Sequence, residues 1–305
     1  MSNKKIDTLV EDIYDVFLKS HTINEENLKE FGENVKGVLR KNIKAASEKR
    51  NPYLRLSIIG KPDRQLWYEL KTQDIAKVAE AGDVDVFEPN PEKYIKFLFG
   101  DIIEQLLIFL IKESGHTLSH VQEELKIDDV LGHCDVVIDG VPVDIKTASK
   151  YAFTQKFKFG GLLRGDDPFG YVGQLSAYRE KLTELYPEEI DSERVAWLAM
   201  NKETGELCLL LADSLDLINA EDRIKHIKKF LEKDAPPEEK CYPDEPEGEN
   251  GNRVLSKTCV YCPFKQECWK NSNDGRGLRI FKYSNGDKYF THIVKIPRVE
   301  EKINA

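Results

Sequence analysis

The 305-residue sequence has no hydrophobic run long enough to cross a lipid bilayer. Its most apolar stretch, residues 102–111, is shorter than the roughly 20 residues that a spanning helix needs and is interrupted by Glu104 and Gln105. No basic segment followed by an apolar run and a cleavage site opens the chain, so no secretory signal is recognisable. These absences predict a soluble, cytoplasmic protein with no membrane partner.

Basic residues are outnumbered by acidic ones: the chain has 45 Lys and Arg residues and 54 Asp and Glu residues, for a net charge of −9. That balance argues against a protein that coats nucleic acid nonspecifically. The charge is uneven, however: residues 36–64, 146–164 and 253–295 carry +7, +5 and +6, which leaves −27 on the rest. Three basic stretches predict a local surface for an anionic ligand, although solvated helix faces would explain the first stretch equally well.

Cysteine is rare, with six residues in the whole chain, and a disulfide framework is not expected in an intracellular protein of this size. Three cysteines, Cys259, Cys262 and Cys268, form a C-x2-C-x5-C arrangement that is typical of a zinc or iron–sulfur site. Such sites usually need a fourth ligand, and Cys241 is the nearest candidate. The two other cysteines lie in apolar segments and are expected to be small core residues; they are Cys134 and Cys208.

The order of the expected elements is that of an α/β protein with an extra segment at each end. Apolar residues three and four positions apart predict helices in the first 50 residues, and residues 92–112 predict a helix that is buried on most faces. The predicted domains are an N-terminal helical arm and entry segment (1–91), an α/β core (92–234), an acidic proline-rich linker (235–252), and a cysteine-bearing lobe with a final hairpin (253–305).

Residues 132–147 are typical of two β-branched strands joined by the turn Asp139-Gly140. Because side chains alternate along a strand, Asp144 and Lys146 are expected on one face, where Asp135 can approach them. Carboxylates suit hard divalent cations such as Mg²⁺, and a lysine beside the metal can orient or deprotonate an attacking water. This pattern predicts metal-assisted phosphodiester hydrolysis, although surface charges at the end of a hairpin would explain a D-x-K tripeptide taken alone.

Two further features have two interpretations each. Glu104 lies in an apolar helix and therefore needs a cation, a metal or a hydrogen-bond donor, for which an ordinary salt bridge would suffice. Residues 150–159 alternate cations with aromatic rings, as single-strand nucleic-acid binders do, but an exposed strand with one aromatic core face would have the same pattern. The cations of this segment are Lys150, Lys156 and Lys158.

Four short motifs follow one another in order between residues 92 and 180. They are G-x-x-x-E ending at Glu104, G-x-x-D ending at Asp135, D-x-K-T containing Asp144 and Lys146, and Q-x-x-x-Y formed by Gln174 and Tyr178. Each motif alone is weak, but the ordered set resembles the PD-(D/E)XK nucleases of the RecB-like and Cas-type exonuclease branch, which includes phage-encoded enzymes. A phage-encoded member would work in the host cytoplasm.

The resemblance implies a restriction-endonuclease-like α/β fold, with a central mixed sheet flanked by helices, beside the helical arm and the cysteine-bearing lobe. It implies that Glu104, Asp135 and Asp144 bind one or two Mg²⁺ or Mn²⁺ ions and that Lys146 positions or activates the nucleophilic water. Gln174 and Tyr178 would hold the DNA backbone, and a recombination or replication protein is a candidate partner. The basic residues expected to contact DNA are Arg64, Lys150, Lys156 and Lys158.

Some members of this family hold a 4Fe-4S cluster through one early cysteine and three late cysteines with the spacing seen here. The early cysteine lies in a segment like S-x-x-x-x-C-x-R-x-x-x-Y, which Ser57 to Tyr68 fits, but the cysteine position is occupied by Pro62. Either Cys241 substitutes for it, or the three late cysteines hold zinc or a labile cluster, or the site is degenerate. We favour Cys241 as the fourth ligand, with the metal open between iron–sulfur and zinc.

The predicted activity is therefore Mg²⁺-dependent hydrolysis of DNA by an exonuclease. A structure-specific endonuclease on the same fold is one alternative, and a non-catalytic DNA-binding or recombination scaffold is another. A zinc-dependent interaction module would require the carboxylates to be incidental. The complete set of Glu104, Asp135, Asp144 and Lys146 counts against a scaffold, because a degenerate site usually loses one of them.

Overall fold

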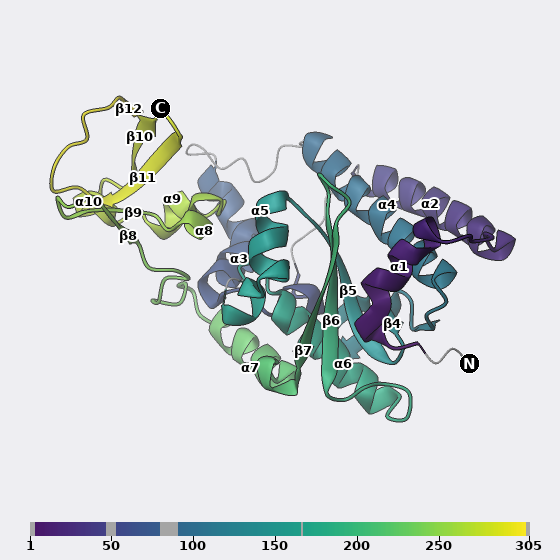
Figure 1. Ribbon diagram of the computed structural model, residues 1–305. Helices are drawn as coiled ribbons and strands as arrows, with labels where there is room; N and C mark the ends of the chain where they lie inside the picture. The colour runs from purple at the N-terminus through teal and green to yellow at the C-terminus, as the bar shows by residue number, and fades with distance from the viewer. Residues whose placement is uncertain (1–3, 47–52, 80–90, 166, 303–305) are drawn as a thin grey trace. The chain divides into compact units, whose positions relative to one another are not determined.

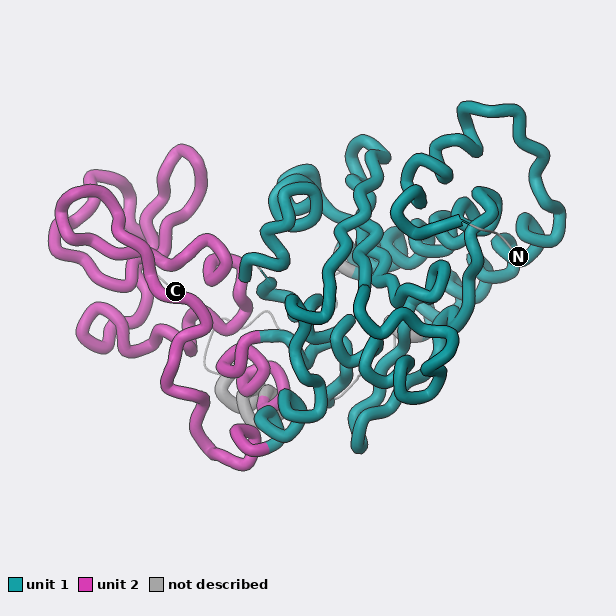
Figure 2. Tube along the Cα trace, turned by 60° about the horizontal axis from the view of Figure 1, so that its bottom comes forward, with its two compact units in different colours: residues 1–61, 89–228 teal, residues 62–88, 229–305 magenta. Residues whose placement is uncertain are grey.

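The computed structural model describes residues 4–46, 53–79, 91–165 and 167–302 (Figure 1). The chain forms two compact units, each assembled from two separate segments (Figure 2). The first unit contains Met1–Lys61 and Pro89–Lys228, and the second contains Pro62–Glu88 and Lys229–Ala305. Each unit is therefore described by itself.

A five-stranded sheet forms the centre of the first unit, in the order β1-β4-β5-β6-β7. The β5–β6 pair is parallel, whereas β1–β4, β4–β5 and β6–β7 are antiparallel. This confirms the predicted α/β class with a mixed sheet flanked by helices. The strands are β1 (Leu118–Ser119), β4 (Val136–Ile138), β5 (Val141–Ala148), β6 (Arg194–Asn201) and β7 (Leu207–Asp213).

Helices cover both faces of this sheet. On one face, apolar residues of α1 and α4 form a continuous core with alternate residues of β5 and β6, including Val143 and Leu198. Figure 1 shows α1, α2 and α4 together on this side. On the other face lies α6, whose Gln174 reaches Asp144 of β5. The helices are α1 (Leu9–Leu18), α2 (Glu25–Ala46), α4 (Pro91–Glu113), α6 (Tyr171–Leu185) and α7 (Ala220–Leu231).

The helical arm and the apolar helix are confirmed as helices, but α4 is less buried than its sequence predicts. From Ile103 onward it packs against the sheet and α1, and Phe109 also contacts Phe31 of α2. Ile95 and Phe97, in its first turns, are 65% and 55% exposed. Among the described helices, none combines the length and apolarity that a membrane span requires.

The predicted hairpin at residues 132–147 is confirmed only in its second part. Strands β4 and β5 pair across Asp139-Gly140, where both residues have positive φ (50° and 85°), as a two-residue type I′ turn requires. Residues before Asp135 instead belong to β3 (Val130–Cys134), which pairs with β2 (Glu123–Ile127) in a separate two-stranded sheet. Asp135 therefore lies at the point where the chain changes partner.

The basic-aromatic segment is helical, so the alternative interpretation as an exposed strand is wrong, whereas single-strand binding stays a prediction. It forms the short α5 (Lys150–Ala152), capped by the Ser149 side chain, and a π-helical turn over Phe153–Lys158. Phe153 and Phe157 are buried, which places two of the four rings in the protein interior. The two buried rings are four residues apart, so they lie on the same face of a helix.

The second unit contains α3 (Asp63–Ala79) and a five-stranded sheet in the order β12-β10-β11-β9-β8. The predicted final hairpin is confirmed as β10 (Arg279–Tyr283) and β11 (Gly286–His292), whose Phe281 and Phe290 form a small core with Val254. The remaining elements are β8 (Glu245–Glu247), β9 (Asn252–Val254), β12 (Glu301–Lys302), α8 (Lys257–Val260), α9 (Lys265–Cys268) and α10 (Ser272–Gly275). Strand β8 lies within the stretch that was predicted as a linker.

Three glycines allow the backbone to cross closely at the start of α6. A Cβ atom on Gly60 would lie 2.5 Å from the carbonyl oxygen of Gly170, and one on Gly173 would lie 2.4 Å from the Cα atom of Gly60. Gly170 also has a φ of +79°, which favours glycine. This crossing determines where α6, and with it Gln174, meets the sheet.

Gly60→Ala is therefore expected to lower the free energy of unfolding by about 3 kcal/mol, because the backbone of Gly170 must move to admit the methyl group. Gly32→Ala is a matched control: Gly32 lies in α2, and beyond the neighbouring turns of that helix no atom of the described residues lies within 4 Å of the position that a methyl group would take. It should raise the same free energy by up to about 1 kcal/mol. Urea denaturation measures both, and equal stability of the Gly60 variant and the wild type would contradict the close crossing.

Candidate functional site

Strand β5 brings the predicted acid and lysine together on one face of the central sheet. The Nζ atom of Lys146 lies 2.5 Å from Oδ1 of Asp144 and 5.0 Å from the ring centroid of Tyr171. Val143 and Ile145 point into the core on the opposite face, as the alternation predicts. The predicted arrangement of the D-x-K residues is thus confirmed.

Asp135 joins this pair through the backbone of the same strand. Its Oδ2 atom accepts a hydrogen bond of 2.9 Å from the N–H of Ile145, the residue between Asp144 and Lys146. The carboxylate of Asp135 is also close enough to raise the pKa of Asp144. The change of strand partner at Asp135 therefore allows its side chain to turn toward β5.

Asp144 is fully buried, and one of its two carboxylate oxygens is unused. Oδ1 accepts hydrogen bonds from Lys146 and, at 3.0 Å, from Nε2 of Gln174. Oδ2 has no hydrogen-bond partner among the residues that the structure describes. Burial raises the pKa of Asp144 to about 7, with Lys146 opposing the shift and Asp135 reinforcing it. A carboxylate oxygen that is buried without a hydrogen-bond partner destabilises the folded protein unless a cation faces it.

Glu104 of α4 adds a third carboxylate. Its Oε1 atom accepts hydrogen bonds from Nε2 of Gln122 at 2.8 Å and from Nε2 of Gln105 at 3.4 Å. Burial raises the pKa of Glu104 to about 8, and the negative charge of Asp135 contributes to this rise. The expected partner of this partly buried acid is therefore supplied by side-chain amides.

A groove of about 900 Å³ opens in front of Glu104 and Asp135. Tyr53, which is 58% exposed, lies in its wall, and the Arg55 guanidinium lies 5.5 Å from the Tyr53 ring centroid. The wall is rich in acids, with fewer cations. Its ionisable residues are Glu30, Glu33, Lys41, Arg55, Asp101, Glu104, Glu124, His133 and Asp135, beside the tyrosines.

The residues predicted to bind DNA lie in several different environments. Gln174 and Tyr178 line the groove, but they are only 7% and 1% exposed, and Gln174 already binds Asp144. Lys156 is buried over the Phe169 ring, at 5.2 Å. Lys158 pairs with Glu206 at 2.7 Å. DNA contacts of these residues and of the exposed Lys150 stay predictions.

Two contributors to the site were missed from the sequence. Tyr171 places its ring close to the Lys146 ammonium, and its position one helical turn before Gln174 is a signal that could have identified it. Gln122 hydrogen-bonds Glu104 from a loop position with a φ of 55°. No local pattern marks Gln122, because its contact joins residues 18 positions apart.

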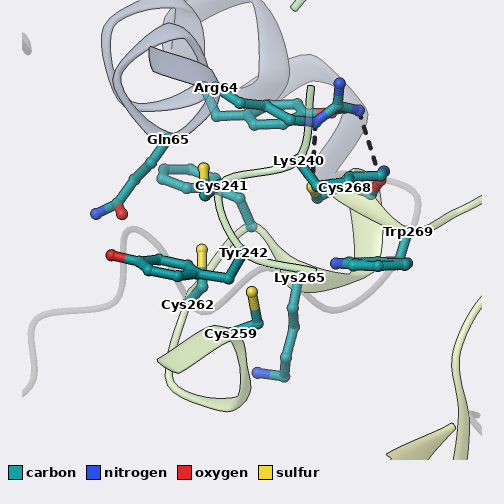
Figure 3. Close-up of a pocket in the computed structure, with 12 residues that line it drawn as sticks. Arg64, Gln65, Lys240, Cys241, Tyr242, Cys259, Cys262, Lys265, Cys268 and Trp269 are labelled. Carbon is teal, nitrogen blue, oxygen red and sulfur yellow. Dashed lines mark hydrogen bonds between the residues drawn. The ribbon is translucent and has the colours of Figure 1, made fainter. Parts of the chain in front are cut away.

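The second unit brings Cys241, Cys259, Cys262 and Cys268 into the wall of one small pocket (Figure 3). Burial raises the pKa of Cys262 to about 11 and that of Cys241 to about 12. Arg64 lies in the same wall, and its Nε atom donates a hydrogen bond of 3.2 Å to Sγ of Cys268. Arg64 thus contacts a cysteine, and its predicted contact with DNA stays a prediction.

Neither cluster is arranged as a finished site for a single ion. Within the described parts of the chain, no three His, Cys, Asp or Glu side chains are placed so that they could hold one metal ion. In the first unit, Oδ1 of Asp144 accepts hydrogen bonds from Lys146 and Gln174, which leaves Oδ2 as the oxygen that could face an ion. The donor chemistry nevertheless fits a hard divalent cation, because the charges of Asp135 and Asp144 reach Glu104 and one buried oxygen of Asp144 lacks a partner among the described residues.

Comparisons with known proteins leave the family open. No family model matches the chain, and no curated protein matches it. Among solved structures, the crystal structure of SSO0001 resembles it at 13% sequence identity and a TM-score of 0.36, over 74% of this chain and 91% of that chain. A likeness at this level does not bear on the fold or the function.

Proposed function

We propose that the protein is a metal-dependent deoxyribonuclease of the PD-(D/E)XK type, which hydrolyses DNA phosphodiester bonds as an exonuclease. One observation carries the proposal: β5 holds Asp144 and Lys146 beside Asp135 and Glu104, and Asp144 keeps a buried oxygen without a partner among the described residues. Carboxylates and a lysine in this relation are the groups that metal-assisted hydrolysis needs.

Glu104, Asp135 and Asp144 would bind Mg²⁺ or Mn²⁺ through their carboxylate oxygens. A bound ion supplies Lewis-acid activation of a water and neutralises charge on the phosphate. The raised pKa values of Glu104 and Asp144 support this role, because carboxyls that resist ionisation gain most from a nearby cation.

The protein's own groups then orient the reaction. Lys146 can hold the attacking water or a phosphate oxygen, since its ammonium lies over the Tyr171 ring and beside Asp144. The Gln174 amide fixes the orientation of Asp144, and the Ile145 N–H fixes that of Asp135. Such supporting contacts are typical of ligands that must keep one geometry.

The groove is consistent with a nucleic-acid strand as the substrate. Its volume of about 900 Å³ exceeds what a single nucleotide fills, and the exposed Tyr53 ring can stack on a base. Its acidic wall would disfavour a polyanion without metal ions, which fits a requirement for divalent cations.

Digestion of end-labelled linear DNA tests the proposal. Wild-type protein with Mg²⁺ should release short labelled products from a 5′- or a 3′-labelled strand, EDTA should abolish the release, and covalently closed circular DNA should stay intact. Cleavage of the circular DNA would indicate an endonuclease, because an exonuclease needs a free DNA end. DNA binding without cleavage in the presence of Mg²⁺ or Mn²⁺ would favour a non-catalytic DNA-binding scaffold and overturn the proposed hydrolysis.

A further inference from the structure

The groove in front of Glu104 and Asp135 also contains groups that take no part in the proposed hydrolysis. We propose that Lys41, Tyr53 and Arg55 form a binding site for an unpaired nucleotide strand, in which Tyr53 stacks on a base and the two cations bind phosphates. The inference rests on the proposed function, because the strand is the substrate of that reaction. It is tested by binding, which does not require cleavage.

Tyr53 and Arg55 belong to a segment that is fixed at the wall of the groove. The backbone of Arg55 forms a parallel bridge with Leu131 of β3, and the next residue, Leu56, is fully buried. Leu131 precedes Asp135 by four residues, which corresponds to about 13 Å along a strand. The pair therefore shares the groove with the proposed metal-binding carboxylates and lies at a distance from them, where a nucleotide that flanks the cleaved bond is placed.

The ring of Tyr53 is available for stacking. Tyr53 is 58% exposed, and the ring contact that it makes within the described chain is with the Arg55 guanidinium, 5.5 Å from the ring centroid. This contact orients the ring without burying it. Aromatic rings at the wall of a groove are the usual stacking platforms for the bases of single strands, with further support from arginine.

Lys41 and Arg55 are exposed cations of the same wall. Lys41 lies on α2, on the helix face that also carries Asn34 and Gly37 of the wall. Among the residues that the structure describes, no carboxylate lies within ion-pair distance of Lys41 or Arg55. Both cations can therefore bind a phosphate without breaking an ion pair.

The acids of the wall are compatible with a bound strand. Three of them lie at the proposed metal site: Glu104, Asp135 and Asp101, whose charge reaches Glu104. The other three each have a partner: Glu30 pairs with Lys112 at 2.6 Å, Glu33 with Lys36 at 2.6 Å, and Glu124 contacts the His133 imidazole at 3.6 Å. Negative charge in the rest of the wall is thus largely compensated, whereas Lys41 and Arg55 are not, which suits a phosphate backbone.

An unpaired strand fits these groups better than a duplex does. The bases of a duplex are stacked on one another, so a protein ring reaches a base face only at an end or after the strands open. The bases of a single strand offer their faces to a ring, and its phosphates remain open to lysine and arginine.

Binding of a labelled oligothymidylate of about 16 nucleotides to the full-length protein tests the proposal. Fluorescence anisotropy in Ca²⁺ should show binding, and an unlabelled single strand should compete better than a blunt duplex of the same length. Tyr53→Ala should weaken binding by about 10-fold, whereas Tyr53→Phe should bind like the wild type, because stacking needs the ring and not the hydroxyl. Wild-type affinity in folded Tyr53→Ala, or stronger competition by the duplex, would overturn the proposal.

The salt dependence of binding tests the two cations. Loss of one phosphate contact should make the slope of log K against log salt concentration shallower by about 0.7 for a single strand. Arg55→Gln and Lys41→Gln should each show this change. Lys202→Gln, at an exposed lysine of the same unit outside the groove, should keep the wild-type slope. An unchanged slope in both groove variants would exclude the phosphate contacts.

Photochemical crosslinking uses only the wild type, so a folding defect of a variant cannot affect it. Irradiation of the complex with an oligonucleotide that contains 5-iodouracil should attach the base to Tyr53, as identified by peptide mass spectrometry. Crosslinks to Tyr151, the exposed tyrosine of the basic-aromatic segment, without any to Tyr53 would place the strand elsewhere and overturn the proposal.

These results also separate the binding site from the proposed function. Weaker binding by Tyr53→Ala and Arg55→Gln, together with a wild type that binds but does not cleave DNA in Mg²⁺, would support the binding site and overturn the hydrolysis. Mg²⁺-dependent cleavage by the wild type, together with wild-type binding by both folded variants, would support the hydrolysis and overturn the binding site.

Discussion

Asp144→Asn is expected to lower the rate of Mg²⁺-dependent DNA cleavage by about 10³-fold. Asparagine keeps the hydrogen bond with Gln174 but removes the negative charge and replaces one metal-binding oxygen by an amide. A loss of about 4 kcal/mol of transition-state stabilisation corresponds to this factor. The rate is measured on end-labelled linear DNA at saturating Mg²⁺.

Lys146→Met should cause a loss of about 10² to 10⁴-fold in the same assay, because methionine has a similar length but cannot donate a proton or a hydrogen bond. Lys202→Met is the matched control, since Lys202 is exposed on the same unit outside the groove. It should cleave at the wild-type rate. Circular dichroism verifies that all three variants are folded. Wild-type cleavage by folded Asp144→Asn or Lys146→Met would disprove the assigned site.

Glu104→Gln is expected to remove much of the pH dependence of stability in the metal-free protein. The pKa of Glu104 in the folded protein is about 8, above its ordinary value of 4.5, so the fold favours the neutral acid. This contribution is complete below pH about 4.5 and is lost as the pH rises through about 8. The pKa of Asp144 is raised in the same direction.

In EDTA, the free energy of unfolding of the wild type should therefore fall by about 3 kcal/mol between pH about 5 and pH about 8.5. Glu104→Gln should lose clearly less over this interval, because glutamine cannot ionise. Urea denaturation at both pH values measures the difference. Glu188→Gln, at an exposed glutamate, should retain the wild-type dependence. Equal pH dependence in wild type and Glu104→Gln would show that Glu104 is not forced into a neutral state.

Mg²⁺ should also restore stability at the higher pH more strongly in the wild type than in Glu104→Gln. A cation between the carboxylates relieves their repulsion, and binding to the folded state alone stabilises it by mass action. This effect requires no DNA substrate, so it separates metal binding from catalysis.

Local sequence alone determined much of the first unit. The Asp139-Gly140 turn and the β-branched residues around it specify the β4–β5 hairpin, because turn chemistry and alternation depend on near neighbours. The same alternation places Asp144 and Lys146 on one face before any tertiary contact is known. The helices α1, α2 and α4 follow in the same way from their apolar spacing.

Other features were decided only by the tertiary structure. The segment after Ser149 alternates like a strand, yet it is helical, because burial of Phe153 and Phe157 four residues apart outweighs the local pattern. The first turns of α4 are apolar but exposed, because the sheet and α1 contact only its later part. Local propensities are small, and contacts between distant residues override them.

The sequence by itself determined which groups could perform chemistry: the ordered carboxylates, the lysine and the C-x2-C-x5-C cysteines. Only the tertiary structure decided their surroundings. It turned Asp135 toward β5, left Oδ2 of Asp144 buried without a partner among the described residues, and brought Cys241 into the pocket of the other cysteines. The physical reason is that the burial and the electrostatic environment of a side chain depend on contacts between segments that are distant in the sequence. A short motif does not specify those contacts.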